Sequence, residues 1–266
     1  NLALFRYTLA SNGVKLVVIS AGLVLMGVLM PVMFAAFGQE VGEFVESVPL
    51  LSQFANFGGG DLFSLSGSLA LGFTHPFTLL LLGIMAIAFP ALAIAGERDK
   101  GTLEVTLSRP ISRHVLLATL FVAGLGFLAL LIGMLVVTMS VTTFIVGLSD
   151  QLTPGNLVQL WAAGVLLFVA FMALAFAVSV NSDRPGPAIG IPAVFVLLNY
   201  LAFAIGSIWP DMRWLEDYSM FNLLKAQDTL ADGLAPSDAL IMLAFTGVLM
   251  ALAWYRFPRR DLPAPS

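Results

Sequence analysis

The stretch from Gly96 to Thr102 is the part of this 266-residue chain that comes nearest to a nucleotide-binding motif. It reads Gly-Glu-Arg-Asp-Lys-Gly-Thr, and its two glycines have the spacing of a phosphate-binding P-loop. A P-loop needs a lysine directly after its second glycine, and Thr102 occupies that position here. The stretch also follows a long apolar run instead of a strand. We therefore expect that this chain does not itself bind ATP.

Acid–base and metal chemistry have few candidate residues. The two histidines, His75 and His114, flank different apolar runs at what we expect to be opposite membrane faces, so they cannot form a pair. The chain has no cysteine, which excludes disulfides and thiolate-bound metals. No acid or base lies in the middle of an apolar run, where proton-driven carriers usually keep one. We therefore expect no resident cofactor, no enzymatic activity and no nucleic-acid partner.

The composition indicates a protein that is solvated by lipid. Hydrophobic residues make up 59% of the chain and charged residues 11%, whereas soluble domains carry about a quarter charged residues. Six continuously apolar runs are each long enough to cross about 30 Å of hydrocarbon as helices, and their lack of alternation excludes barrel strands. The runs are 16–37, 77–95, 116–138, 157–180, 188–208 and 239–257. The sequence therefore predicts an all-α membrane protein with one six-span domain.

The basic residues divide unevenly between the two sides of these spans. Ten of the twelve fall on the side that holds both termini: Arg6, Lys15, Arg98, Lys100, Arg109, Arg113, Arg184, Arg256, Arg259 and Arg260. The two on the other side are Arg213 and Lys225. Because cytoplasmic loops of membrane proteins are enriched in Lys and Arg, we expect both termini to be cytoplasmic.

Two segments on the expected outer side have the pattern of amphipathic helices. Segment 39–57 gathers apolar residues such as Phe44 and Leu51 on one helical face and breaks near Pro49. Segment 213–230 repeats the pattern with Trp214 and several later apolar residues. We expect two interfacial helices, which either cap the membrane surface or form an outer gate.

The inner segment 96–113, between the second and third runs, predicts a short surface helix. Thr102 can cap its start and Glu104 suits its positive first turn. Leu103 and Leu107 are one turn apart and would form an apolar ridge that fits a groove on a soluble partner. Pro110 should end this helix and open the third span. The alternative is an ordinary charged loop.

The same segment carries a resemblance to a known family. Its Gly-Thr-Leu-Glu at 101–104 and Ser-Arg-Pro-Ile-Ser-Arg at 108–113 resemble the signature loop of ABC-2 type permeases, the transmembrane subunits of a large exporter class. Segments 57–62, 228–233 and 256–262 agree with six-span bacterial members, so the resemblance covers the whole chain. It implies a half-transporter whose inner loop is a coupling helix that touches an ATPase subunit.

The resemblance also implies which residues couple the chain to that ATPase. We expect Leu103, Glu104 and Leu107 to contact it, and Arg109 or Arg113 to pair with Glu97 or Glu104. The full set of candidate coupling residues is Glu97, Gly101, Thr102, Leu103, Glu104, Leu107, Arg109 and Arg113.

In the family's pattern, spans one, two and five line a pathway between two permease copies. Asn199 and Tyr200 are the candidate polar groups that face it, and the alternative is that they only pack helices. The candidate apolar wall consists of Met85, Phe89, Phe195 and Phe203. A charged cargo would need a compensating charge at membrane depth, so we expect an amphipathic or lipid-like cargo.

The partners implied by the resemblance are two P-loop ATPase subunits and a second permease copy, either identical or closely related. The expected location is a bacterial or archaeal cytoplasmic membrane. The alternative function is that of an ATP-independent polytopic membrane protein, either a secondary carrier or an assembly factor.

Overall fold

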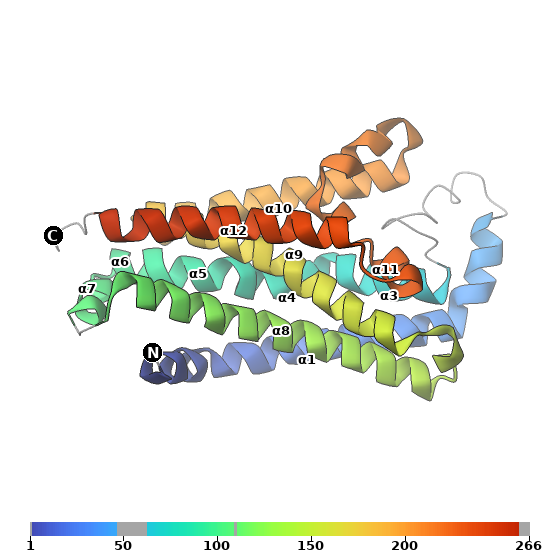
Figure 1. Cartoon of the computed structure of the whole chain (residues 1–266). Coiled ribbons are helices and arrows are strands. Elements are labelled where there is room, and N and C mark those ends of the chain that lie inside the picture. Colours follow the sequence, from blue (N-terminus) through green and yellow to red (C-terminus); the bar gives the residue numbers. More distant parts are fainter. Residues whose placement is uncertain (1, 47–62, 109–110, 261–266) are drawn as a thin grey trace.

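The computed structural model describes residues 2–46, 63–108 and 111–260, which fold into a bundle of long helices (Figure 1). No strand occurs among these residues. Within the described ranges, six helices are long and apolar enough to cross a membrane, as the six apolar runs predict. Both ends of the chain therefore lie at one end of the bundle, beside the short helix α7 (Thr102–Leu107). We call this end of the bundle the termini end, and the other end of the bundle the opposite end.

Each predicted span lies inside one of these six helices. The membrane-length helices are α1 (Leu2–Glu46), the segmented helix Pro76–Asp99, α8 (Arg113–Ile145), α9 (Pro154–Asn181), α10 (Pro185–Ile208) and α12 (Pro236–Arg259). A short helix, η4 (Ser149–Gln151), joins α8 to α9. The helices extend beyond the apolar runs at most ends, because polar residues continue the helix past the expected hydrocarbon boundary.

Helix α9 lies at the centre of the bundle. In its most apolar window 83% of the residues are buried, against 22% in α10 and in α12. Small residues alternate with phenylalanines along α9, so neighbouring helices approach closely. A Cβ atom on Gly164 would lie 2.9 Å from Cε1 of Phe73. By contrast, α1, α10 and α12 expose apolar side chains that lipid or another membrane protein can cover.

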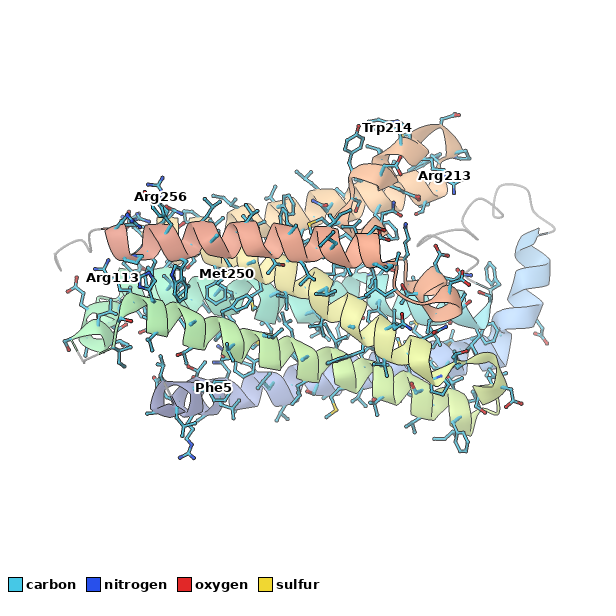
Figure 2. All side chains as sticks on the ribbon, viewed as in Figure 1. Phe5, Arg113, Arg213, Trp214, Met250 and Arg256 are labelled. Atoms are coloured by element: carbon cyan, nitrogen blue, oxygen red, sulfur yellow. The ribbon has the colours of Figure 1, made fainter. Side chains whose placement is uncertain are left out.

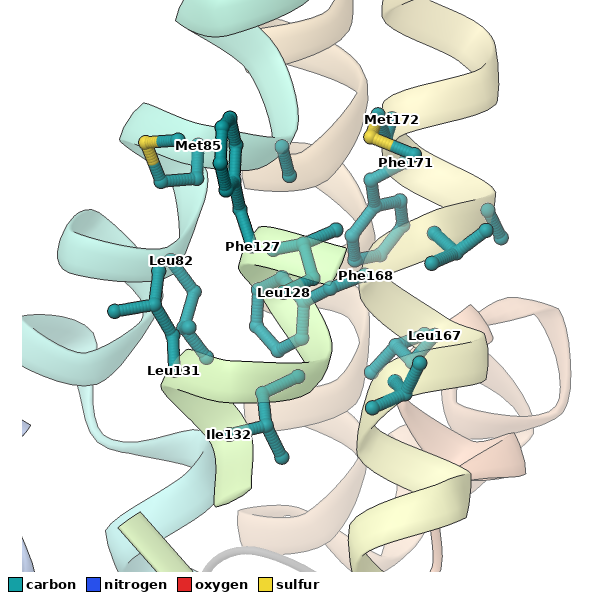
Figure 3. Packing of buried hydrophobic residues seen from close by; sticks show 14 of the residues in the cluster. Leu82, Met85, Phe127, Leu128, Leu131, Ile132, Leu167, Phe168, Phe171 and Met172 are labelled. Atoms are coloured by element: carbon teal, nitrogen blue, oxygen red, sulfur yellow. The ribbon is translucent and has the colours of Figure 1, made fainter. Parts of the chain in front are cut away.

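The core forms where α9 meets α8 and the segmented helix (Figure 3). Phe168 and Phe171 of α9 pack edge to face with ring centroids 6.0 Å apart. Phe127 of α8 meets Phe89 in the same manner at 5.4 Å. Such pairs add about 1 kcal/mol each to the burial of the rings.

The segmented helix consists of α4 (Pro76–Gly83), η2 (Ile84–Ala88), α5 (Phe89–Ala91), η3 (Leu92–Gly96) and α6 (Glu97–Asp99). Both η2 and η3 are π-helical turns. They flank Pro90, which has no N–H and whose ring would clash with the preceding turn of a regular α-helix. The hydroxyl of Ser179 on α9 pairs with backbone groups of this irregular stretch. It donates to the Pro90 carbonyl at 3.2 Å and accepts the Ala95 N–H at 3.1 Å.

The chain before the segmented helix differs from the sequence-based expectation. Helix α1 is one continuous helix of 45 residues, so the start of segment 39–57 does not form a separate interfacial helix. Residues 47–57 of that expected helix lie outside the described part of the chain. Sequence analysis also missed α3 (Leu65–Thr74), a buried helix that meets α4 at His75. At ten residues, α3 is too short to register as a span.

Segment 213–230 is also not a single amphipathic helix. It contains η5 (Pro210–Tyr218), η6 (Met220–Leu223) and the start of α11 (Ala226–Asp232). Trp214 of η5 is 58% exposed, whereas Phe221 of η6 is 1% exposed. Tight helical turns with breaks at Ser219 and Lys225 send these apolar residues to different sides.

Candidate functional site

Helix α7 stands at the termini end, between the segmented helix and α8 (Figure 1). Gly101, not Thr102, occupies its N-cap position, with a left-handed φ of +70° that only glycine adopts without strain. Thr102 is the first residue of the helix, and its hydroxyl contacts the backbone carbonyl and the carboxylate of Glu97. These contacts close the turn between α6 and α7. The helix ends at Leu107, while Arg109 and Pro110 lie outside the described residues.

The apolar side of α7 faces the bundle, not a free surface. Leu103 is 2% exposed and belongs to the hydrophobic core, and Leu107 packs against that core. The expectation that Leu103 contacts a partner is therefore corrected, whereas Leu107 is only partly buried and its contact with a partner stays a prediction. A six-residue helix is unstable alone, so burial of its own leucines is what holds it. Val105, which is 64% exposed, and Glu104 remain accessible to a partner.

Arg113 begins α8, so the third span opens three residues later than Pro110 suggests. Its Nη1 donates to the carbonyls of Phe257, Pro258 and Arg260, at 3.1, 3.3 and 2.6 Å. Arg113 thus satisfies the last carbonyls of α12. It makes no ion pair with Glu97 or Glu104, so that half of the expected pairing is wrong.

Arg98, which sequence analysis did not single out, is the most deeply buried charge at this end. Its side chain is 2% exposed, and Nη1 donates to the carbonyls of Val180 and Ser182 at 3.2 and 2.6 Å. Nε and Nη2 have no hydrogen-bond partner. Arg98 therefore fastens the residues just before α7 to the end of α9. The sequence signal was an arginine three residues after the predicted end of the second span, within a run of charged residues.

Asp183 and Arg260 complete this network, which we call the arginine network. Arg260 Nη2 lies 2.7 Å from the Asp183 carboxylate, and Arg260 Nη1 donates to Val180 O at 2.9 Å. Arg98 Nη1 lies 4.0 Å from the same carboxylate. The Asp183 carboxylate thus faces two guanidinium groups. Through them the segment just before α7 is linked to both α9 and α12.

An open groove of about 820 Å³ lies between α7, the first turns of α1 and the inner part of the segmented helix. Its lining includes apolar residues such as Leu92, Ala93 and Leu116. Polar residues line it as well: Tyr7, Thr8, Ser11, Asn12, Lys15, Glu97, Lys100 and Thr106. Lys15 is oriented by a 3.2 Å hydrogen bond from Nζ to Asn12 Oδ1. The volume and mixed lining suit an amphipathic molecule.

The candidate pathway residues on the segmented helix and α10 do not form one open wall. Met85 is 1% exposed and Phe203 is 4% exposed, so both pack inside this chain. Phe195 packs against Phe171 and Phe245. Phe89 alone of the six also lines the groove beside α7.

Asn199 makes packing contacts within this chain, and its place on a pathway between two copies stays a prediction. Its Nδ2 donates to Phe195 O at 3.0 Å, and its Oδ1 accepts the Met220 N–H at 2.9 Å. Its backbone carbonyl accepts from the Ser219 hydroxyl at 2.8 Å. Asn199 therefore anchors η6 to α10. The neighbouring Tyr200 ring packs against Phe221, at 5.8 Å between centroids.

These features define a multi-span membrane protein with a firmly anchored surface helix on the loop between its second and third spans. Comparison with known proteins gives the family. The model described as "ABC-2 family transporter protein" matches residues 7–262, so the chain belongs to this family. The chain is also 29% identical over 212 residues to the "Probable ABC transporter permease protein NosY" of Pseudomonas aeruginosa. That alignment covers 68% of this chain and 77% of the relative.

Proposed function

We propose that this permease subunit is driven through α7 by a separate ATPase subunit. The observation that carries the proposal is the arginine network, which links the base of α7 to α9 and α12. A force applied to α7 would then move the central helix of the bundle, and not only a surface loop. Glu104 and Val105 are the accessible groups for the contact, whereas Leu103 and Leu107 hold α7 on its own bundle.

In the proposed assembly, two permease copies and two ATPase subunits form the transporter. ATP and magnesium bind in the ATPase subunits, and this chain carries no catalytic residue. Both termini and α7 face the cytoplasm, and the bilayer is a bacterial or archaeal cytoplasmic membrane. The concentration of basic residues at the termini end supports this orientation.

The proposed cargo is amphipathic or lipid-like, and the proposed direction is export. The groove beside α7 supports this class, because its lining combines apolar and polar residues, which suit the two halves of an amphiphile. Its wall includes Leu103 and Val105 of α7. Cargo in the groove would therefore be sensed at the helix that the ATPase moves.

The experiment is ATPase activity of the reconstituted complex across a panel of amphiphiles. Glu104→Ala and Val105→Ala should abolish cargo-stimulated hydrolysis while insertion and assembly persist. Arg184→Ala is the matched control, since Arg184 is exposed at the same end but outside α7. Normal stimulation in a Glu104→Ala/Val105→Ala double variant would contradict coupling through α7.

Orientation is tested separately, because the chain has no native cysteine. Ser108→Cys on the α7 loop should react with an impermeant thiol reagent only from the cytoplasmic side. Asp150→Cys in η4 should react only from the other side. Labelling of both from one side would contradict the proposed topology.

A further inference from the structure

A second groove at the termini end lies between α8 and α12, away from the groove beside α7. Its volume is about 590 Å³, and its lining residues are His114, Met250, Ala251, Trp254, Tyr255 and Arg259. Figure 2 shows Met250 and Arg256 on α12 at the same end of the bundle as Arg113. Met250 and Ala251 lie deeper in the span than the aromatic residues. The groove therefore changes from apolar to cationic toward the end of α12.

The aromatic side chains of this groove are held in place yet accessible. The Trp254 ring packs on His114 with centroids 4.6 Å apart. The Arg259 guanidinium lies 3.8 Å above the Tyr255 ring and donates to its carbonyl at 2.8 Å. Trp254 and Tyr255 are nevertheless 43% and 58% exposed. Trp and Tyr at the end of a span mark the level of the lipid headgroups.

The charge at the mouth of the groove is uncompensated within the described part of the chain. Arg256 and Arg259 lie in the last turn of α12, and neither forms an ion pair with a described acid. The next residue, Arg260, differs because Asp183 neutralises it. The helix dipole favours cations in this turn. It does not explain why the Arg259 guanidinium lines an apolar, aromatic groove, with Arg256 in the same turn outside the lining.

We propose that this groove binds an anionic phospholipid. The headgroup phosphate lies at Arg259, with Arg256 in the same turn of α12 adding positive potential; Trp254 and Tyr255 flank the glycerol region, and an acyl chain follows Met250 and Ala251. The exposed Val248 and Leu252 continue the same lipid-facing helix, as a chain-binding surface requires. A soluble protein would leave these apolar side chains uncovered, so charge and depth together favour a lipid. The proposal is independent of coupling through α7.

The test is quenching of Trp254 fluorescence by bromine-labelled lipid in nanodiscs. Wild-type protein and Trp254→Phe are compared, with one-tenth of the lipid as brominated phosphatidylglycerol or brominated phosphatidylcholine. The difference in quenching between wild-type protein and Trp254→Phe gives the contribution of Trp254 alone, without the other tryptophans. Phosphatidylglycerol should quench several times more than phosphatidylcholine at equal fraction, since each arginine near a membrane surface contributes roughly a fivefold preference for anionic lipid. The preference should weaken as salt is raised.

Charge variants assign the effect to this groove. Arg256→Gln/Arg259→Gln should reduce the phosphatidylglycerol preference to the phosphatidylcholine level, whereas Arg256→Lys/Arg259→Lys should keep most of it. Arg6→Gln and Arg184→Gln are matched controls at the same end and should change nothing. Equal quenching by both lipids, or a preference that survives the double glutamine variant, overturns the proposal. So does loss of quenching when the ATPase subunit is added, because that assigns the surface to a protein contact.

Discussion

The two ends of the bundle are held by different chemistry. At the termini end, guanidinium groups of Arg98, Arg113 and Arg260 donate to the last carbonyls of α9 and α12. At the opposite end, neutral amides hold most of the segment between α10 and α12, and an ion pair of 3.2 Å between Lys225 Nζ and Asp238 Oδ2 joins it to α12. Asn156 Nδ2 donates to the carbonyls of Leu230 and Ala231, both at 2.9 Å, and Asn199 accepts from Met220.

This difference shows how each end can respond to load. A charge-assisted hydrogen bond is roughly twice as strong as a neutral one, and one guanidinium can serve two or three carbonyls at once. The termini end therefore joins several helices into one stiff unit. At the opposite end the amides make one or two neutral bonds per side chain and Lys225–Asp238 is a single ion pair outside any network, so its short helices can be released separately.

The largest effect is expected from Arg98→Ala, which cuts the arginine network at its buried member. The variant removes two charge-assisted hydrogen bonds and leaves the Ser182 carbonyl without its donor, while Val180 O keeps Arg260 Nη1, and it should lower the free energy of unfolding by about 3 kcal/mol. Cargo-stimulated hydrolysis should fall with it. Thermal unfolding in detergent measures the first effect and an ATPase assay the second. Arg184→Ala should change stability by less than about 0.5 kcal/mol, and equal effects of the two variants would refute the special role of Arg98.

A smaller effect is expected from Asn199→Leu at the opposite end. The change removes the acceptor for the Met220 N–H and should cost about 2 kcal/mol, confined to η6. Hydrogen exchange should rise at 219–221 and stay unchanged at α7. Leu198→Ala, at a neighbouring position that is 60% exposed, is the control. Exchange that rises throughout the bundle would show that the two ends are not independent.

Gly101→Ala should have a modest effect at the termini end. No atom lies within 4 Å of the added Cβ, so the cost is the backbone strain at φ +70°, about 1 kcal/mol. Gly126→Ala, which also has open space but lies inside α8, should instead be neutral or slightly stabilising. Thermal unfolding of both variants decides whether α7 needs the left-handed cap.

The smallest effect concerns Glu216 in η5. Burial raises the pKa of this carboxyl above its ordinary value of 4.5, Arg213 opposes the shift, and Asp217 adds to it. The folded state thus holds the proton more tightly than the unfolded state. Its contribution to stability is complete below pH 4.5 and is lost as pH rises through the raised pKa. Hydrogen exchange of η5 should increase over that window, and Glu216→Gln should remove the change. An unaltered pH dependence in the variant would assign it to another group.

The sequence predicted the spans well because a continuous apolar run of membrane length has few alternatives to a helix. It predicted the existence of α7 from Thr102, Glu104 and Pro110, but not which way α7 faces. Leu103 has the same pattern whether it packs on its own bundle or on a partner, so only the tertiary structure distinguishes the two. Arg98 was missed as an anchor for the same reason, since its carbonyl partners lie more than eighty residues away.

The two π turns in the segmented helix determine the direction in which the side chains that follow them point. Phe89 N–H bonds to Ile84 O and Glu97 N–H bonds to Leu92 O, each five residues back instead of four. One extra residue per turn shifts the side chains that follow by about 100°, so two such turns shift them by roughly 200°. Arg98 thereby points into α9, where a regular helix with the same sequence would direct it to nearly the opposite side. Deletion of one residue from either turn would rotate α7 about the axis of the second span.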